Sequence, residues 1–406
     1  MYWNGRRLRP DRAITALLAW LAGTMLAVTA LAQSSPPAPP EGEYQALLVT
    51  YGPGEVYWER FGHNAIWLRE PARNLDHAFN FGFFDFDQPN FLRRFVQGRM
   101  LYFAAAVPTE RELGWYREAG RSVRVQALNL GPLEYAHLRD LLLEQVEPEN
   151  RDYLYDYYFD NCSTRVRDVL DQALDGLLAE QFRTQAEVLT LREHTRRATE
   201  RDYWYYLGLE IGLGEPVDAH ATRWDEMFLP GVLAESIEEI TRMGPNGLEP
   251  LVAEDNVVFE GTVAPLPSTP TPVWPRYLAA GLGLAALLIL LARFAPAILG
   301  NGLALGWVLI SGTAGIGLLA LMLGTDHAAT RPNINPLLLN PVALLALVPA
   351  WRVFAAMVMA LGVVAAALMA AWPGGQYLVD VLAFLAPLQL VAAGMVWRMG
   401  VRRSAD

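Results

Sequence analysis

The chain has 406 residues, of which 53% are hydrophobic and 18% are charged. This composition is too apolar for an ordinary soluble enzyme of this size, and it excludes disorder, collagen-like structure and coiled coil. All 32 basic residues are arginines, which excludes Schiff-base lysine chemistry, and the single cysteine, Cys162, excludes an intramolecular disulfide or a cysteine-rich metal site.

The net charge of −11 is unevenly distributed along the chain. Residues 33–273 carry 39 acidic residues against 21 arginines, whereas residues 274–406 carry 7 arginines against 3 aspartates. Nucleic-acid binding depends on neutralising phosphates, so a strongly acidic domain is a poor partner for it. The sequence therefore predicts a protein that does not bind nucleic acid.

Residues 1–32 are typical of a signal peptide. Arginines between Arg6 and Arg12 precede an apolar stretch from Ile14 to Ala30, and Ala30-Leu31-Ala32 fits a small-residue cleavage site. The apolar stretch is also long enough to remain as an uncleaved anchor. Residues 33–42 are rich in Ser and Pro and predict a tether. In either case we expect the chain to leave the cytoplasm after this segment.

The next region, residues 43–264, predicts an α+β domain. An apolar strand at 45–51 is followed by a hairpin of strands at 63–68 and 77–81 around the turn-rich Pro71–Asn74. The other predicted elements are helices at 88–97, 109–119, 132–146 and 163–178 and strands near 100–107 and 122–130.

Cys162 lies at the predicted start of a helix. An aromatic run from Tyr153 to Phe159 leads into Asp160-Asn161-Cys162, and either Asp160 or Asn161 would cap the helix. Unpaired N–H groups and the positive helix end stabilise a thiolate, so we expect a lowered thiol pKa. A lone cysteine is more often a small core residue. However, an exported chain seldom keeps an idle exposed thiol, so we predict that Cys162 is a nucleophile.

A thiol nucleophile needs an imidazole to accept its proton. Among the six histidines, His63 is the best candidate, because it opens a strand after Gly52-Pro53-Gly54-Glu55, where glycines allow close approach of the backbone. His137 is expected on a solvated helix face, and His194 and His220 lie in polar stretches without a partner pattern.

The last third of the chain predicts a membrane domain at 274–406, after a Pro/Thr-rich linker at 265–273. Five apolar runs are candidate spans, at about 275–293, 303–323, 337–351, 353–372 and 377–397. The third is short enough to be a re-entrant or tilted helix. If the first span runs from outside to inside, most of the region's arginines fall on the cytoplasmic side. We therefore predict a multi-pass membrane protein whose acidic domain lies outside the cytoplasm.

The loop between the second and third runs is predicted to lie on the outer face. It carries Asp326, His327, Asn333 and Asn335. The ordinary polarity of a loop would explain these residues, but an ionisable cluster between spans is also typical of a functional site. They are therefore candidate substrate-binding or supporting residues. The aromatic stretches Tyr203–Tyr206 and Trp224–Phe228 are interpreted as core or interfacial anchors.

Several motifs, in order along the chain, resemble the Lnb-type lipoprotein N-acyltransferase family. They are Tyr51–Glu55, Arg60–His63, Phe79–Gly82 through Phe84–Phe86, Pro148–Arg151 and Tyr158–Arg165, with Thr325–His327 and Asn333–Asn335 in the outer loop. The order of His before Cys is also similar to permuted papain-like folds, which include NlpC-like hydrolases and the lecithin:retinol acyltransferase group. The resemblance implies such a fold for the exported domain, followed by an all-α membrane domain. It also implies a multi-pass protein of the bacterial inner membrane with the catalytic domain on the periplasmic side.

The same resemblance implies Cys162 as the nucleophile and His63 as the general base. For the residue that orients the imidazole we prefer Asn80, on the next strand, over His77 and Asp76. Asp160, Asn161 and Glu55 are expected to support the site, with helix-start N–H groups and Asn161 holding the oxyanion.

The implied reaction is a ping-pong transfer of an acyl chain from a membrane phospholipid, through a thioester on Cys162, to the α-amine of a diacylglyceryl-cysteine lipoprotein. No metal or organic cofactor is expected, and the sequence makes no prediction of the oligomeric state. Two alternatives stay open: an NlpC-type peptidoglycan amidase or endopeptidase, and a non-enzymatic membrane assembly protein in which Cys162 is a packing residue.

Overall fold

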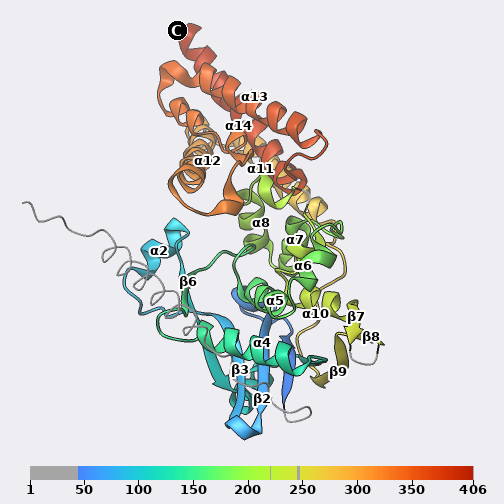
Figure 1. The fold of residues 1–406 in the computed structure, drawn as a ribbon. Coiled ribbons are helices and arrows are strands. Elements are labelled where there is room, and N and C mark those ends of the chain that lie inside the picture. Colours follow the sequence, from blue (N-terminus) through green and yellow to red (C-terminus); the bar gives the residue numbers. More distant parts are fainter. Residues whose placement is uncertain (1–43, 220, 245–246, 406) are drawn as a thin grey trace, which may run out of the picture. The chain divides into compact units, whose positions relative to one another are not determined.

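A computed structural model describes residues 44–219, 221–244 and 247–405, so the predicted signal segment 1–32 and tether 33–42 lie outside the described residues, as does His220. Within these ranges an α+β region is followed by a region of long apolar helices (Figure 1). The α+β class predicted for the exported domain is confirmed.

A seven-stranded antiparallel sheet forms the centre of the first region, with the strand order β6-β4-β3-β2-β1-β5-β9. The predicted strand at 45–51 and the predicted hairpin are its middle. Its strands are β1 (Gln45–Tyr51), β2 (His63–Glu70), β3 (Leu75–Phe83), β4 (Leu101–Pro108), β5 (Val123–Leu128), β6 (Asp152–Leu154) and β9 (Val252–Phe259). A separate hairpin pairs β7 (Thr241–Gly244) with β8 (Gly247–Pro250).

Helices cover both faces of this sheet, because alternate residues of the central strands are apolar on each side. One face carries Leu48, Ile66 and Phe79 and packs against α4, α5 and α10 (Figure 1). The other face carries Tyr51 and Ala65 and packs against α3. The helices of this region are α2 (Phe91–Gln97), α3 (Thr109–Glu118), α4 (Pro132–Gln145), α5 (Cys162–Ala173), α6 (Leu177–Phe182), α7 (Leu191–Thr199), α8 (Tyr203–Gly212), α9 (Arg223–Glu226) and α10 (Pro230–Glu238).

The helix expected at 163–178 is two helices in the structure. Asp175 (φ 54°) and Gly176 (φ 87°) adopt left-handed backbone conformations, which end α5 and begin α6. The aromatic stretch at 224–228 is core, since Trp224 and Phe228 are buried, whereas Trp204 in the other stretch is 71% exposed.

Among the described residues, four helices are long and apolar enough to cross a membrane, one fewer than the five predicted. They are α11 (Trp274–Phe294), α12 (Ala297–Gly324), α13 (Arg352–Ala370) and α14 (Val379–Ala405). The third apolar run instead forms short 3₁₀ turns: η5 (Asn335–Leu337), η6 (Pro341–Leu347) and η7 (Pro349–Trp351). Pro336 just before this run, and Pro341 and Pro349 within it, lack the N–H that an α-helix needs, which explains the interruption.

This irregular segment is enclosed by the neighbouring helices. A Cβ atom at Gly315 of α12 would collide with the carbonyl oxygen of Leu339, and one at Gly362 of α13 would collide with that of Leu337. Gln389 of α14 donates from Nε2 to the carbonyl oxygen of Leu338 (2.5 Å). Non-helical backbone is tolerated at membrane depth only where protein satisfies it, and small residues here allow that contact.

Candidate active site

The start of α5 brings Cys162 to the beginning of β2. The backbone N–H of Asn64, the residue after His63, points at the thiol. Ser163 Oγ lies 2.9 Å from Asn64 Oδ1, which fixes the helix start against the strand. On β3, a Cβ atom at Gly82 would be 3.5 Å from Cys162 Cβ. The predicted nucleophile and the predicted base therefore belong to adjoining segments at one end of the central strands.

Asn161 is the residue that caps this helix. Its Oδ1 accepts the backbone N–H groups of Ser163 (2.9 Å) and Thr164 (3.0 Å), and its Nδ2 donates to the carbonyl oxygens of Tyr157 and Phe228. Its hydrogen-bonding groups are thus engaged within the fold. Asn161 supports the position of Cys162, but its amide is not free to bind an oxyanion, contrary to the expectation from sequence.

A chain of hydrogen bonds, which is part-buried at His63 and buried beyond it, holds the imidazole of His63. His63 Nε2 lies 2.8 Å from Asn80 Oδ1, and Asn80 Nδ2 donates to Glu112 Oε2 (2.5 Å) and to the carbonyl oxygen of Ala78 (3.2 Å). Tyr51 donates its hydroxyl to the other carboxylate oxygen of Glu112 (2.5 Å). Because Asn80 Nδ2 donates to Glu112 and Ala78, the oxygen Oδ1 is the atom that faces His63. An amide oxygen can only accept, so Nε2 carries the imidazole proton and Nδ1 is the basic nitrogen.

The position of Asn80 comes from the sheet register, which pairs it with Ala65, two residues after His63. Asn80 and Glu112 are each only 1% exposed. Burial raises the pKa of Glu112 to about 7, against the lowering effect of its hydrogen bonds to Tyr51 and Asn80. No hydrogen bond joins the thiol to the imidazole among the described residues, as is common before substrate binds.

Burial decides the charge states of the Cys–His pair. It lowers the pKa of His63 to about 4, although the hydrogen bond to Asn80 opposes this. It raises the pKa of Cys162 to about 11, although the N–H groups of Asn64 and Ser163 and the charge of Arg121 act in the other direction. The expected lowering of the thiol pKa is therefore wrong, because desolvation outweighs the helix start. At neutral pH both groups are uncharged.

We therefore expect Cys162 to react slowly with iodoacetamide. With a pKa of about 11, roughly one thiol in 3,000 is ionised at pH 7.5, whereas about a tenth of free cysteine is. Alkylation at pH 7.5 should be about 300-fold slower than for free cysteine and should rise about tenfold per pH unit. Mass spectrometry reports this directly, because Cys162 is the only cysteine. Rapid alkylation with a midpoint near pH 6 would instead show a thiolate–imidazolium pair.

One buried hydroxyl near Cys162 has no partner among the described residues. It belongs to Tyr153, which is 7% exposed. The hydroxyl lies 4.0 Å from the place that a Cβ atom of Gly82 would take, and Cys162 Cβ lies 3.5 Å from the same place. Gly82 has φ 102° and lies where the pairing of β3 with β4 is irregular. A side chain at position 82 would therefore approach both the hydroxyl and the nucleophile.

Two predicted supporting residues, Asp160 and Glu55, have different surroundings. Asp160 binds Arg165 through both carboxylate oxygens (2.5 and 2.8 Å), and this guanidinium lies 3.9 Å from the ring centre of Tyr153. Asp160 thus acts on the site through the packing of Tyr153. Glu55 is exposed in the loop after β1.

Arg121 is a buried cation beside the site that sequence reasoning did not identify. It is 5% exposed, its guanidinium stacks on Tyr116 (4.7 Å), and its Nη2 has no partner among the described residues. A cavity of about 200 Å³ is lined by this arginine together with Asn80, Phe83, Glu112 and Tyr116. The positive charge lowers the pKa values of both His63 and Cys162.

The outer-loop residues Asp326 and His327 contact α2 of the first region. The N–H of Asp326 donates to the carbonyl oxygen of Gln97 (2.8 Å), and its carboxylate pairs with Arg99 (2.5 Å). His327 Nε2 donates to the carbonyl oxygen of Phe95 (3.1 Å). The His327 ring also stacks near Tyr157, with ring centres 6.3 Å apart. This half of the loop therefore meets the segment that leads to Cys162.

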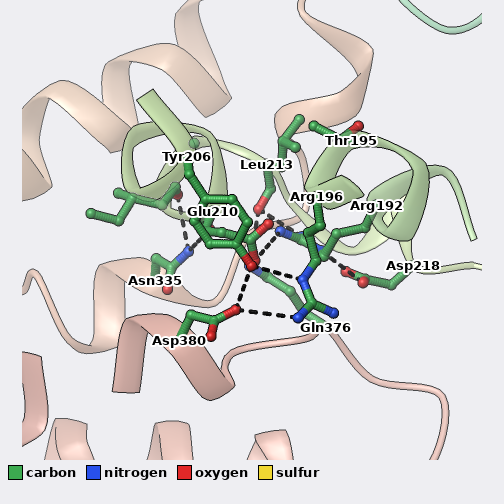
Figure 2. Close-up of polar contacts among 12 residues, drawn as sticks. Arg192, Thr195, Arg196, Tyr206, Glu210, Leu213, Asp218, Asn335, Gln376 and Asp380 are labelled. Carbon is green, nitrogen blue, oxygen red and sulfur yellow. Dashed lines mark hydrogen bonds and ion pairs between the residues drawn. The ribbon is translucent and has the colours of Figure 1, made fainter. Parts of the chain in front are cut away.

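Asn335 instead joins a buried polar cluster between α7, α8 and the membrane helices (Figure 2), and the buried Asn333 contacts the same segment. Asn335 Nδ2 donates to the carbonyl oxygens of Glu210 and Ile211, and Asn333 Nδ2 donates to that of Leu213. These contacts tie the loop to the end of α8. The two asparagines therefore connect the loop to α8. Their hydrogen bonds to the described residues do not reach Cys162.

Charged groups make up the rest of this cluster (Figure 2). Tyr206 donates its hydroxyl to Asp380 of α14 (2.7 Å), and Arg196 lies 3.6 Å from the same carboxylate oxygen. Arg192 of α7 pairs with Asp218 (2.7 Å) and Glu210 (3.3 Å). Removing one partner of a buried ion pair typically costs about 3–5 kcal/mol. The cluster therefore holds α7 and α8 firmly against the start of α14.

These features define a class: a membrane protein whose exported α+β domain presents a cysteine at a helix start beside a histidine held by a buried amide. Residues 43–198 match the Lnb N-terminal periplasmic domain, and residues 268–403 match the Lnb transmembrane domain. The chain belongs to the Lnb family. No curated protein and no solved structure matches it, so the papain-like fold stays a prediction.

Proposed function

We propose that the protein is a thiol-dependent lipoprotein N-acyltransferase on the periplasmic side of the bacterial inner membrane. It would move an acyl chain from a phospholipid to Cys162 and then to the α-amine of a diacylglyceryl-cysteine lipoprotein. The observation that carries this proposal is the single cysteine at the start of α5, next to the His63–Asn80–Glu112 chain. Family membership and the coupling of this domain to apolar helices support lipid substrates.

In the first half-reaction, Cys162 Sγ attacks the carbonyl carbon of a phospholipid acyl ester. His63 accepts the thiol proton as the S–C bond forms, because both groups are neutral beforehand. The C–O bond of the ester then breaks, and the leaving lysophospholipid oxygen takes the proton from His63. The products are a thioester on Cys162 and a lysophospholipid.

In the second half-reaction, the free α-amine of the lipoprotein attacks the thioester carbonyl. His63 accepts a proton from the amine, the C–S bond breaks, and the proton returns to the departing sulfur. The amide product leaves, and the thiol and neutral imidazole are restored. Asn80 keeps Nε2 protonated in both steps, so the same nitrogen, Nδ1, serves as the base each time.

The oxyanion in both steps needs donors, and the helix start offers few. Asn161 already occupies the N–H groups of Ser163 and Thr164. The N–H of Cys162 and the unpartnered hydroxyl of Tyr153 are the donors we assign to the oxyanion. Such preorganised donors act strongly in a site shielded from water.

Replacing Tyr153 with phenylalanine is expected to lower kcat about 100-fold with little change in KM, because one oxyanion donor is lost while the ring and its packing stay. Both half-reactions should slow, which single-turnover mass spectrometry of the Cys162 adduct would measure. The matched control is Tyr158→Phe. Tyr158 is equally buried, but its hydroxyl bonds to Thr195 (2.8 Å). A Tyr153 variant that works as fast as this control would remove the hydroxyl from the mechanism.

The direct test of the function uses the full-length protein in phospholipid nanodiscs. Mass spectrometry should find an acyl group on Cys162, which disappears when a diacylglyceryl-cysteine lipopeptide is added and appears on its amine. A peptidoglycan hydrolase would instead cleave stem peptides and gain no acyl group from the bilayer. A non-enzymatic assembly protein would do neither.

A further inference from the structure

The helix α2 exposes an apolar face. Leu92, Phe95 and Val96 are 72%, 44% and 55% exposed, and the helix has no buried residue. At about 100° per residue, these side chains and Phe91 fall within roughly 140° of the helix circumference, with Arg93 at its edge. The helix borders a shallow hollow of about 660 Å³. Such a face is typical of a helix that lies on a membrane surface.

The position of α2 is fixed by its contacts with the loop that follows a membrane helix, α12. α12 has 28 residues, so it is about 42 Å long, which is close to the thickness of a bilayer with its headgroups. The loop that follows it binds the end of α2 through Asp326 and His327. Gly98 (φ 72°) allows this contact, since a Cβ atom there would be 2.8 Å from the backbone nitrogen of His327. The apolar face of α2 is therefore held beside the loop that follows α12.

Aromatic rings connect this helix to the nucleophile. Phe91 packs against Phe84 (6.4 Å between ring centres), Phe84 against Tyr102 (5.1 Å) and Tyr102 against Tyr155 (4.2 Å). Tyr102, Tyr155 and Cys162 pack against the same buried core, and a thiolate at Cys162 would raise the pKa values of both tyrosines. These rings form an aromatic wall that extends from the exposed helix towards Cys162.

We propose that α2 lies in the outer leaflet and that a donor phospholipid passes from it along this aromatic wall, which brings its acyl ester to Cys162. The exposed Phe86, which packs against Phe84 and Phe91, extends the same surface. Arg93 is exposed beside it and suits the lipid phosphate. This inference rests on the proposed function for its chemistry, but the location of α2 can be tested separately.

The first test compares two acyl donors in the full-length protein. The variant Leu92→Glu/Val96→Glu, in nanodiscs of phosphatidylethanolamine and phosphatidylglycerol, is assayed for adduct formation on Cys162. One donor is the bilayer phospholipid and the other is p-nitrophenyl butyrate in solution. We expect the ratio of the two rates to fall at least about 10-fold, since charges oppose insertion. The control is Leu133→Glu on α4, which changes an equally exposed leucine (79%). An unchanged ratio overturns the proposal.

The second test locates α2 without any activity. In a Cys162→Ala background, Leu92→Cys provides a single labelling site for a fluorophore, and Leu133→Cys provides its control. Lipids with a nitroxide on the upper acyl chain should quench the label at position 92 and not the label at 133. Absence of quenching, or shielding of position 92 by dimerisation, overturns the proposal. If the wild type gains no adduct from either donor, the acyltransferase function fails while the quenching result still stands.

Discussion

A Cys162→Ser variant should form no acyl-enzyme and should transfer no acyl chain to lipoprotein. We expect the rate to fall by at least about 10⁴-fold, because a hydroxyl is a far weaker nucleophile and a single imidazole of low basicity is a poor activator for it. The adduct would be measured by intact-mass spectrometry in nanodiscs. Transfer would also be measured in cells that lack other N-acyltransferases, through the mass of lipoprotein N-termini.

The change should leave the fold intact, which makes the variant a clean test. Serine is close to cysteine in size, and the capping bonds of Asn161 do not involve the thiol. Thermal unfolding should therefore resemble that of the wild type, within a few degrees. A serine variant that restored N-acylation in cells would contradict a covalent intermediate on Cys162. A variant that failed to fold would be replaced by Cys162→Ala and compared in the same assays.

Local patterns were enough to predict the elements that carry the nucleophile and the base. An apolar run located β1, the turn-rich Pro71–Asn74 located the β2–β3 hairpin, and the polar stretch before Cys162 located the start of α5. The capping residue was left open between Asp160 and Asn161. The structure resolves this because Asp160 pairs with Arg165, whereas Asn161 accepts two helix N–H groups.

Features that depend on distant segments could not be predicted in this way. Glu112 lies on a helix with several other charged residues, and only the packing of α3 on the sheet brings it to Asn80. Tyr153 is one of several tyrosines in an aromatic run. Nothing local shows that its hydroxyl is the one without a partner among the described residues. The sign of the thiol pKa shift was wrong for the same reason, since burial is a property of the tertiary structure.

The interruption of the third apolar run is a different case, because the prolines that cause it are visible in the sequence. Pro336, Pro341 and Pro349 recur at intervals that leave no room for a long α-helix. Hydropathy alone predicted that this run is one of five membrane spans, although its short length also fitted a re-entrant or tilted helix. In the structure, α12 and α13 approach it closely at Gly315 and Gly362.

Replacing His63 with alanine should block formation of the thioester itself. With a thiol pKa of about 11, almost no thiolate exists at pH 7.5 unless a base takes the proton. We expect adduct formation to fall by about 10³-fold at pH 7.5, within the range typical of a lost general base. Raising the pH should recover the variant about tenfold per unit towards pH 10, because the thiolate then forms without help.

The wild type should lose activity at low pH, whereas the His63 variant should gain activity at high pH. Neutral His63 is the active form, and its pKa is lowered to about 4, so the rate should hold down to about pH 5 and fall as the imidazole is protonated near pH 4. Single-turnover adduct formation at a series of pH values measures both profiles. His77→Ala, on β3, is the matched control and should keep the wild-type profile. Normal adduct formation in the His63 variant, together with loss in the His77 variant, would transfer the role of base to His77.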